Sequence, residues 1–186
     1  MKKIFFGFGA IALSVLPFSG IIPGMPNLAE MGSAIAQNIQ KQPQVELNLG
    51  AEKQIILQDS QGQQKTGWEK LEGRAVVNKG DVLRYIVTGL NKSDRPVNKL
   101  TVNQPIPRGM EYVLGSATIP TGAKATYSID GGQKFLEKPT VTVTLPSGKT
   151  EVRPAPAAAY THIRLSFADS VAAKSIVKGT YQVKVR

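Results

Sequence analysis

The last six residues of the chain, Tyr181-Gln182-Val183-Lys184-Val185-Arg186, alternate apolar and polar side chains without interruption. Successive side chains of an extended chain point to opposite faces, so a strand here buries Tyr181, Val183 and Val185 and exposes the other three. Residues 140–145 and 162–167 repeat this alternation. No window of about twelve residues or more shows a strong helical period. The sequence therefore predicts an all-β fold.

Shorter apolar runs predict the remaining strands. We expect them at residues 45–49, 54–58, 74–77, 81–88, 97–103, 110–114 and 124–129. Turn-forming residues separate the strands at 59–62, 78–80, 130–132 and 146–148. The one helical turn that we expect lies at 169–175, where Asp169 or Ser170 can cap it. Many short strands with regular turns favour a two-sheet sandwich, and a barrel is the alternative.

Two residue counts exclude whole classes of site. The chain has 186 residues, no cysteine and one histidine. Disulfide bonds, thiolate metal sites and mechanisms that need two imidazoles are therefore excluded. A domain of about 150 residues buries roughly 68–70% of its unfolded surface, so we expect the core to fold without disulfide bonds. Gly7, Gly9 and Ala12 imitate a dinucleotide-binding turn, but Pro17 prevents the helix that must follow, and we expect no cofactor.

The N-terminus has the pattern of an export signal. Lys2 and Lys3 precede an apolar run over residues 4–16, and small residues then lead to an A-x-A site that ends at Ala36. An earlier cut near Gly20 is an alternative. All of these features direct the rest of the chain out of the cytoplasm.

The same pattern divides the chain into three parts. We predict a signal peptide over residues 1–36, a flexible polar lead-in over 37–44 and a single domain over 45–186. If the signal is not cleaved, residues 4–22 can serve as a membrane anchor of about 20 residues. We expect contact with a membrane only in that case, and a location in the periplasm or on the cell surface in both.

Residues 78–91 and 100–117 carry a family resemblance. Gly80-Asp81 forms a turn before a strand with an inward Tyr85, and an Asn-containing turn follows at Asn91. Together with the corner at residues 106–109, this pattern resembles the bacterial conserved repeat domain, the eleventh catalogued domain of unknown function. The resemblance covers residues 75–186.

The chain departs from that family at two places. Gln104 stands where the family often has Asp, and Ile106 stands in the corner that usually begins with Leu. The resemblance implies an immunoglobulin-like, two-sheet Greek-key sandwich in an exported, envelope-associated protein, where such domains act as spacers or adhesive modules. It implies no activity.

The excess of positive charge is the other feature to be explained. The formal charge is +10, and it falls to +9 when Lys2, Lys3 and Glu30 leave with the signal peptide. If strands 97–103, 160–167 and 179–185 share a sheet, as strands C, F and G do in immunoglobulin-like sandwiches, their outward residues form one basic face. Those residues are Lys99, His162, Arg164, Lys184 and Arg186. An ordinary solvated strand face is the alternative interpretation.

Candidate catalytic residues are few. His162 lies at a polar position of its strand, beside Arg164, and we expect a surface histidine. Asp59 and Asp130 lack the series of oxygen ligands that calcium loops need, so they predict hairpin turns. Trp68 fits a core or sheet-edge position better than a sugar platform. We expect no catalytic residue and no metal site.

The sequence favours a non-catalytic, exported cell-envelope protein that acts as a structural or protein-interaction module. A binding module for anionic polysaccharide or another envelope polyanion, using the basic face, is the alternative. A hydrolase is the third. The export signal and the lack of aromatic residues among the bases argue against nucleic acid as a partner.

The export prediction can be checked directly on the native protein. Cell fractionation is expected to place the chain in the envelope or medium, with an N-terminus at Gln37 because the peptidase cuts after Ala36. N-terminal sequencing measures this. Full-length protein in the cytoplasm contradicts the prediction, whereas full-length protein in the membrane selects the uncleaved anchor.

Overall fold

The computed structural model describes residues 4–7, 45–167 and 169–186. The predicted lead-in, and the predicted signal peptide apart from residues 4–7, lie outside these ranges. Within them no helix is long and apolar enough to cross a membrane.

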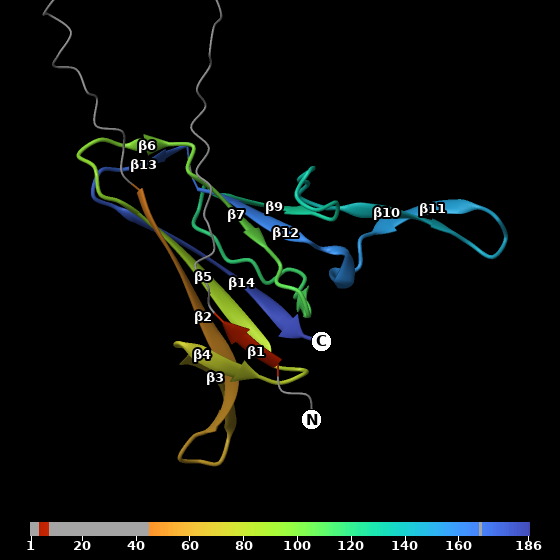
Figure 1. Cartoon of the computed structure of the whole chain (residues 1–186), viewed down its shortest axis with the longest axis horizontal. Coiled ribbons are helices and arrows are strands. Elements are labelled where there is room, and N and C mark those ends of the chain that lie inside the picture. Colours follow the sequence, from red (N-terminus) through yellow and green to blue (C-terminus); the bar gives the residue numbers. More distant parts are fainter. Residues whose placement is uncertain (1–3, 8–44, 168) are drawn as a thin grey trace, which may run out of the picture.

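The larger of the two main sheets has five antiparallel strands in the order β3-β2-β5-β14-β8. Its strands are β2 (Val45–Gln58), β3 (Gln64–Lys70), β5 (Val82–Asn91), β8 (Met110–Tyr112) and β14 (Ile176–Val185). β14 lies between β5 and β8 and uses both of its edges. This sheet runs diagonally across Figure 1.

The smaller main sheet has three antiparallel strands in the order β7-β12-β9. They are β7 (Thr101–Pro105), β9 (Lys124–Ser128) and β12 (His162–Ser166). Three further pairs complete the described chain: β1 (Ile4–Gly7) with β4 (Arg74–Val77), β6 (Val97–Asn98) with β13 (Ser170–Val171), and β10 (Thr140–Thr144) with β11 (Thr150–Pro154). A 3-10 turn, η1 (Ala157–Ala159), precedes β12.

The core lies between the inner faces of the two main sheets. Tyr181 pairs with Tyr85 across β14 and β5, and their rings stack with centroids 5.4 Å apart. Ile163 and Leu165 project from β12 into the same cluster and are fully buried. Because each strand alternates, one side of each sheet is apolar and meets the other sheet. The protein is an all-β two-sheet sandwich, as the sequence predicts.

Gly179 lets the two sheets approach closely. It lies on the inner face of β14, opposite Val87. A Cβ atom added at Gly179 would lie 2.9 Å from Cδ1 of Leu165 on the facing sheet. A larger residue at this point would force that leucine to shift.

Asn91 joins the end of β5 to the segment after β13. Its side chain is fully buried, and Nδ2 donates hydrogen bonds to the carbonyl oxygens of Arg95, Val171 and Ala172 at 2.8, 3.1 and 3.0 Å. Oδ1 accepts from the backbone N–H of Ser93 at 3.0 Å and from its hydroxyl at 2.7 Å. One amide therefore satisfies polar groups from two segments that are far apart in sequence.

This amide explains one wrong prediction. Residues 169–175 do not form a helical turn. Ser170 and Val171 instead pair with Asn98 and Val97. The carbonyl groups of Val171 and Ala172 accept hydrogen bonds from Asn91. The strand predicted at 97–103 is also interrupted, since Lys99 adopts a positive φ of 56°.

The sequence does not predict four of the strands as strands, namely β1, β3, β11 and β13, and two strands that it predicts separately are one. Residues 45–49 and 54–58 belong to the continuous strand β2. β3 and β11 have few apolar residues and extend beyond the core, so neither shows the alternation that marks a half-buried strand. The Greek-key, immunoglobulin-like connectivity implied by the family resemblance stays a prediction.

Replacing Asn91 with leucine is expected to lower the free energy of unfolding by about 2–4 kcal/mol, because a fully buried amide is removed and three carbonyl groups each lose one hydrogen bond. Chemical denaturation measures the change. Asn98→Ala, at an exposed position on β6, is the control and is expected to stay within about 0.5 kcal/mol of the wild type. Equal effects of the two substitutions would contradict this role for Asn91.

Candidate binding site

The five basic residues predicted to share a face do not lie on one sheet. β12 carries His162 and Arg164, whereas Lys184 lies on β14 in the other sheet. The neighbouring residues Leu165 and Val183 both point into the core. Arg164 and Lys184 therefore project from opposite outer surfaces of the sandwich. The prediction that the strands of Arg164 and Lys184 share a sheet is wrong. β14 pairs with β5 on one edge and with β8 on the other, so β12 cannot pair with it.

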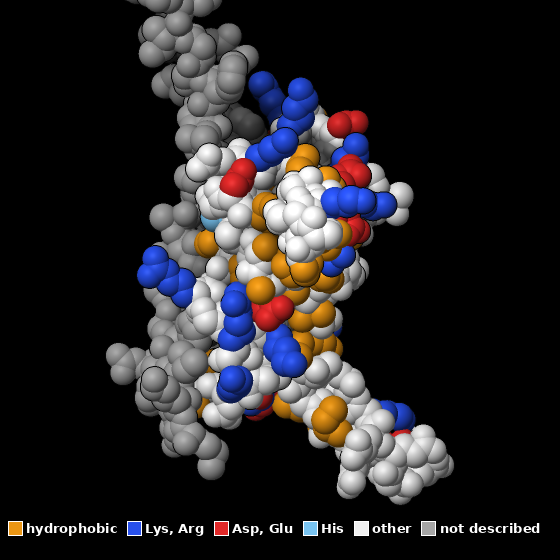
Figure 2. All heavy atoms as spheres, turned by 90° about the vertical axis from the view of Figure 1, so that its right-hand side faces the viewer, with side chains coloured by type: hydrophobic (Ala, Val, Ile, Leu, Met, Phe, Trp, Pro, Cys, Tyr) orange, Lys and Arg blue, Asp and Glu red, His pale blue; other side chains and the backbone are white. Residues whose placement is uncertain are grey.

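The members of the predicted basic face have separate surroundings. The guanidinium of Arg164 lies 3.7 Å from the ring centroid of Phe135, and its Nε donates to Asn103 at 2.8 Å. Arg186 donates to the carbonyl oxygen of Met110 at 3.1 Å and lies beside Glu111. Lys99 is exposed in the bend before β7. Figure 2, which looks along the β10–β11 hairpin, shows cations and acids interspersed around an apolar centre, and no continuous basic stripe on that face.

His162 lies on the outer face of its strand, as predicted. Its Nδ1 is 3.2 Å from the Thr161 hydroxyl, and its ring lies close to Gly132. Within residues 4–7, 45–167 and 169–186, no group of three His, Asp or Glu side chains could hold a metal ion.

Asp59 and Asp130 lie in turns, as predicted. Oδ1 of Asp59 accepts from the backbone N–H groups of Gln61 and Gln63, at 3.0 and 2.9 Å. Oδ1 of Asp130 accepts from those of Gln133 and Lys134, at 3.1 and 3.0 Å. The backbone hydrogen bonds, from Gln63 and Lys134 foremost, hold the pKa of both carboxyl groups below the ordinary value. These carboxylates stabilise turns.

Trp68 lies at the predicted sheet edge. β3 is an outer strand of the five-stranded sheet, and Trp68 pairs with Gln54 on β2. The guanidinium of Arg84 lies 4.1 Å from its ring centroid, while Arg84 Nε donates to Glu52 at 2.8 Å. One face of the indole is therefore covered by an ion-paired arginine and is not open to a sugar.

A hollow lies beside the β10–β11 hairpin, away from the residues that the sequence predicts as a binding face. It has a volume of about 430 Å³ and opens between the edge strands of the two main sheets, β8 and β9, at the base of the β10–β11 hairpin. We name it the tyrosine pocket. Its lining residues are Tyr112, Leu114, Gly115, Tyr127, Glu137, Lys138, Pro139, Thr140, Pro154, Ala155 and Tyr160.

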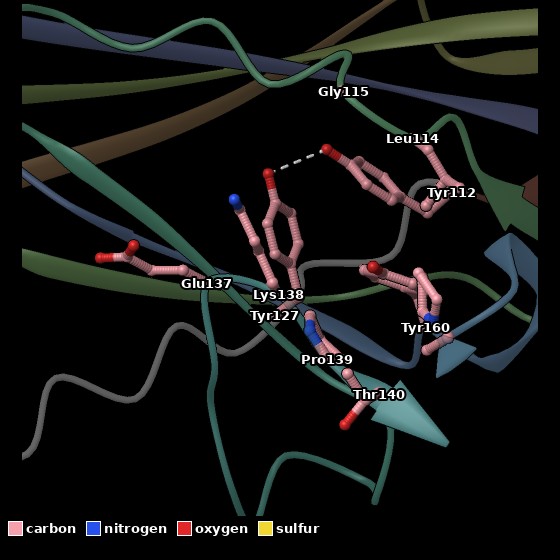
Figure 3. A pocket seen from close by; sticks show the side chains of 11 residues that line it. Tyr112, Leu114, Gly115, Tyr127, Glu137, Lys138, Pro139, Thr140 and Tyr160 are labelled. Carbon is pink, nitrogen blue, oxygen red and sulfur yellow. Dashed lines mark hydrogen bonds between the residues drawn. The ribbon is translucent and has the colours of Figure 1, made fainter. Parts of the chain in front are cut away.

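Three tyrosines form one wall of the pocket. The ring of Tyr112 lies 5.1 Å from Tyr127 and 5.3 Å from Tyr160, and Tyr127 meets Tyr160 edge to face at 5.4 Å. The hydroxyls of Tyr112 and Tyr127 are hydrogen-bonded at 3.1 Å. Figure 3 shows all three phenol groups directed toward one space. Mutual contact holds the three rings in place.

The pocket is apolar and carries little net charge. Leu114 is 53% exposed at its mouth, and Pro139 and Ala155 are buried in its wall. Burial raises the pKa of Tyr160 above the ordinary value. The pKa of Tyr127 is raised further, by burial and by its hydrogen bond to Tyr112. Both phenols therefore stay neutral. The two charged lining residues, Glu137 and Lys138, have opposite signs.

Sequence reasoning missed this pocket. Its three tyrosines come from β8, β9 and the segment before β12, and no pairing between those strands could be read from the chain. Pro154 and Ala155 belong to a segment in which the sequence predicts no strand. The nearest signal is that Tyr112, Tyr127 and Tyr160 all fall within strands that the sequence predicts.

Comparison with known proteins adds nothing to this picture: no family model, no curated protein and no solved structure matches the chain. The resemblance to the bacterial conserved repeat domain stays a prediction.

Burial of the tyrosines predicts how the fold responds to alkali. Burial raises the pKa of Tyr85 to about 12 and raises those of Tyr127, Tyr160 and Tyr181 as well. The folded state thus holds these protons more tightly than the unfolded state, whose phenols titrate near about 10. The buried, protonated phenols therefore contribute fully to the stability of the fold below about pH 10. This contribution is lost as the pH rises towards about 12.

Tyrosinate absorbance and circular dichroism, followed through this range, are therefore expected to change together, because most phenols ionise only as the sandwich unfolds. Gradual ionisation of most tyrosines near pH 10 with intact circular dichroism would contradict the prediction.

Proposed function

We propose that this protein is a non-catalytic, exported binding module of the cell envelope, which holds an extended segment of a partner protein in the tyrosine pocket. The observation that carries the proposal is the pocket itself: a hollow of about 430 Å³ with three mutually fixed tyrosine rings and apolar walls. A volume of this size suits one or two anchoring side chains.

The chemistry of the walls favours a peptide over a sugar. One hydrogen bond joins the hydroxyls of Tyr112 and Tyr127, which leaves fewer polar groups for the many hydroxyls of a sugar ring. Leu114, Pro139 and Ala155 offer only apolar surface. Aromatic-lined grooves bind extended peptide segments through apolar side chains, and such anchors supply most of the binding energy.

Two further observations support a non-catalytic role. The ring nitrogen Nδ1 of His162 contacts a threonine hydroxyl at the outer face of β12, on a different surface from the tyrosine pocket. In addition, Asp59 and Asp130 use their oxygens to hold turns. The export signal predicted at residues 1–36 and the family resemblance support a place in the envelope.

The alternative, binding of an anionic polysaccharide, rests on the total charge of +10. Because Arg164 and Lys184 lie on different sheets, no single sheet face carries both of these cations to bind a polysaccharide. The two functions respond differently to salt: association through exposed charges weakens steeply as ionic strength rises, whereas apolar contact does not.

The tyrosine pocket can be tested by nuclear magnetic resonance with small probes. N-acetyl-tryptophanamide and N-acetyl-prolinamide are expected to shift the backbone signals of residues 112–115, 137–140 and 154–160, because their apolar groups enter the pocket. Tyr160→Ala is expected to weaken this binding about tenfold or more, since it removes one wall of the pocket.

Phe135→Ala is the matched control, because Phe135 is an aromatic residue that packs on Arg164, outside the pocket. It is expected to leave the shifts unchanged. Shifts caused by chitotriose but not by the amides would overturn the peptide proposal in favour of a sugar, and shifts caused only by a polyanion such as heparin, lost in high salt, would favour the alternative.

A further inference from the structure

The β10–β11 hairpin is an arm that pairs with no other strand in the described chain. It extends away from both main sheets (Figure 1). Leu145 donates to Lys149, and Ala155 donates to the carbonyl oxygen of Pro139. In an antiparallel pair, residues alternate between those bonded to the partner and those whose N–H and C=O groups point outward. The outward groups of β10 are therefore those of Thr140, Thr142 and Thr144, and those of β11 include Thr150 and Val152.

The two edges of this arm differ in how they are protected. β11 ends in Pro154, which lacks an N–H group, and carries the ion pair between Arg153 and Glu151 at 2.7 Å. Proline and charged residues are the usual means of preventing strand addition at an edge. β10 has neither: its sequence is Thr-Val-Thr-Val-Thr, and its register has no bulge. No strand within residues 4–7, 45–167 and 169–186 pairs with the outer edge of β10, so this edge can accept another strand.

The sequence of β10 reads the same in both directions. When it pairs antiparallel with a second copy about a two-fold axis at Thr142, Thr140 faces Thr144 of the second copy and Val141 faces Val143 of the second copy. Threonines then meet threonines on one face and valines meet valines on the other. The axis also places the outward N–H and C=O groups of Thr142 opposite their own copies, which can exchange both hydrogen bonds.

Charge does not oppose this pairing at the contact itself. β10 has no charged residue, although the whole chain carries +10. We propose that β10 is a self-association edge, through which two copies of this chain form a two-fold dimer with a continuous four-stranded ribbon, β11-β10-β10-β11. The half-buried side chains of Val141 and Val143 from both copies would form one apolar surface on it.

The absence of cysteine makes a sharp test possible. Thr142→Cys is expected to form a disulfide between copies, because paired residues at the axis have Cα atoms about 5.5 Å apart. Val141→Cys is expected not to, since the two cysteines would then lie diagonally, about 7–8 Å apart. Val152→Cys places the thiol on the protected strand β11 and is also expected not to cross-link, although its non-covalent dimer still forms. Equal cross-linking of all three variants would overturn the proposal.

Sedimentation of the unmodified chain measures the association itself. A monomer–dimer equilibrium is expected, strengthened by salt because two chains of like charge repel. Thr142→Pro removes an outward N–H group without breaking the hairpin and is expected to weaken dimerisation about tenfold or more. Thr142→Ala, which keeps the N–H group, and Val152→Pro, on the other edge, are the controls and are expected to dimerise like the wild type.

Two outcomes of sedimentation would overturn the proposal: a monomer at every concentration, or a dimer that Val152→Pro abolishes and Thr142→Pro does not. Circular dichroism of each variant confirms that the sandwich is folded. Neither Thr142 nor Val152 lines the tyrosine pocket, so failure of this dimer and failure of peptide binding are distinguishable.

Discussion

The pairing of β14 with β5 is the constraint on which the rest of the structure depends. This register places Tyr181 against Tyr85 and Val183 against Leu83, so both strands turn their apolar residues to the same side. The two tyrosine rings stack there, and the smaller sheet closes over them with Ile163 and Leu165. Burial of this apolar surface is the main source of stability. Because β14 is paired on both edges, no strand of the smaller sheet can join it.

The two main sheets therefore face each other without closing into a barrel, and unpaired edges remain. β8 and β9 are the edges on one side, and the tyrosine pocket opens between them. The chain leaves the smaller sheet at the same place to form the β10–β11 hairpin, which finds no third strand in the described chain. Both surfaces to which we assign binding thus arise from the same cause: sheet edges that the sandwich leaves open.

The charge and the tyrosines show why the site was harder to predict than the fold. Arg164 and Lys184 each lie on the outward side of an alternating strand, as their patterns predict. Whether they share a surface depends on which strands pair, and local alternation contains no information on that. The same holds for Tyr112, Tyr127 and Tyr160, which are separated in sequence and meet only because β8 and β9 lie at the same open side of the sandwich.

The sequence by itself determined the fold class, the inward and outward residues of the predicted strands in the two main sheets, and the turns at Asp59 and Asp130. These follow from the two-residue period of a strand and from side chains that bond their own backbone, which are local effects. The tertiary structure alone decided which strands are neighbours, the burial of Asn91, the tyrosine pocket and the open edge of β10. Each of these depends on contacts between distant segments, where long-range packing and pairing outweigh local preference.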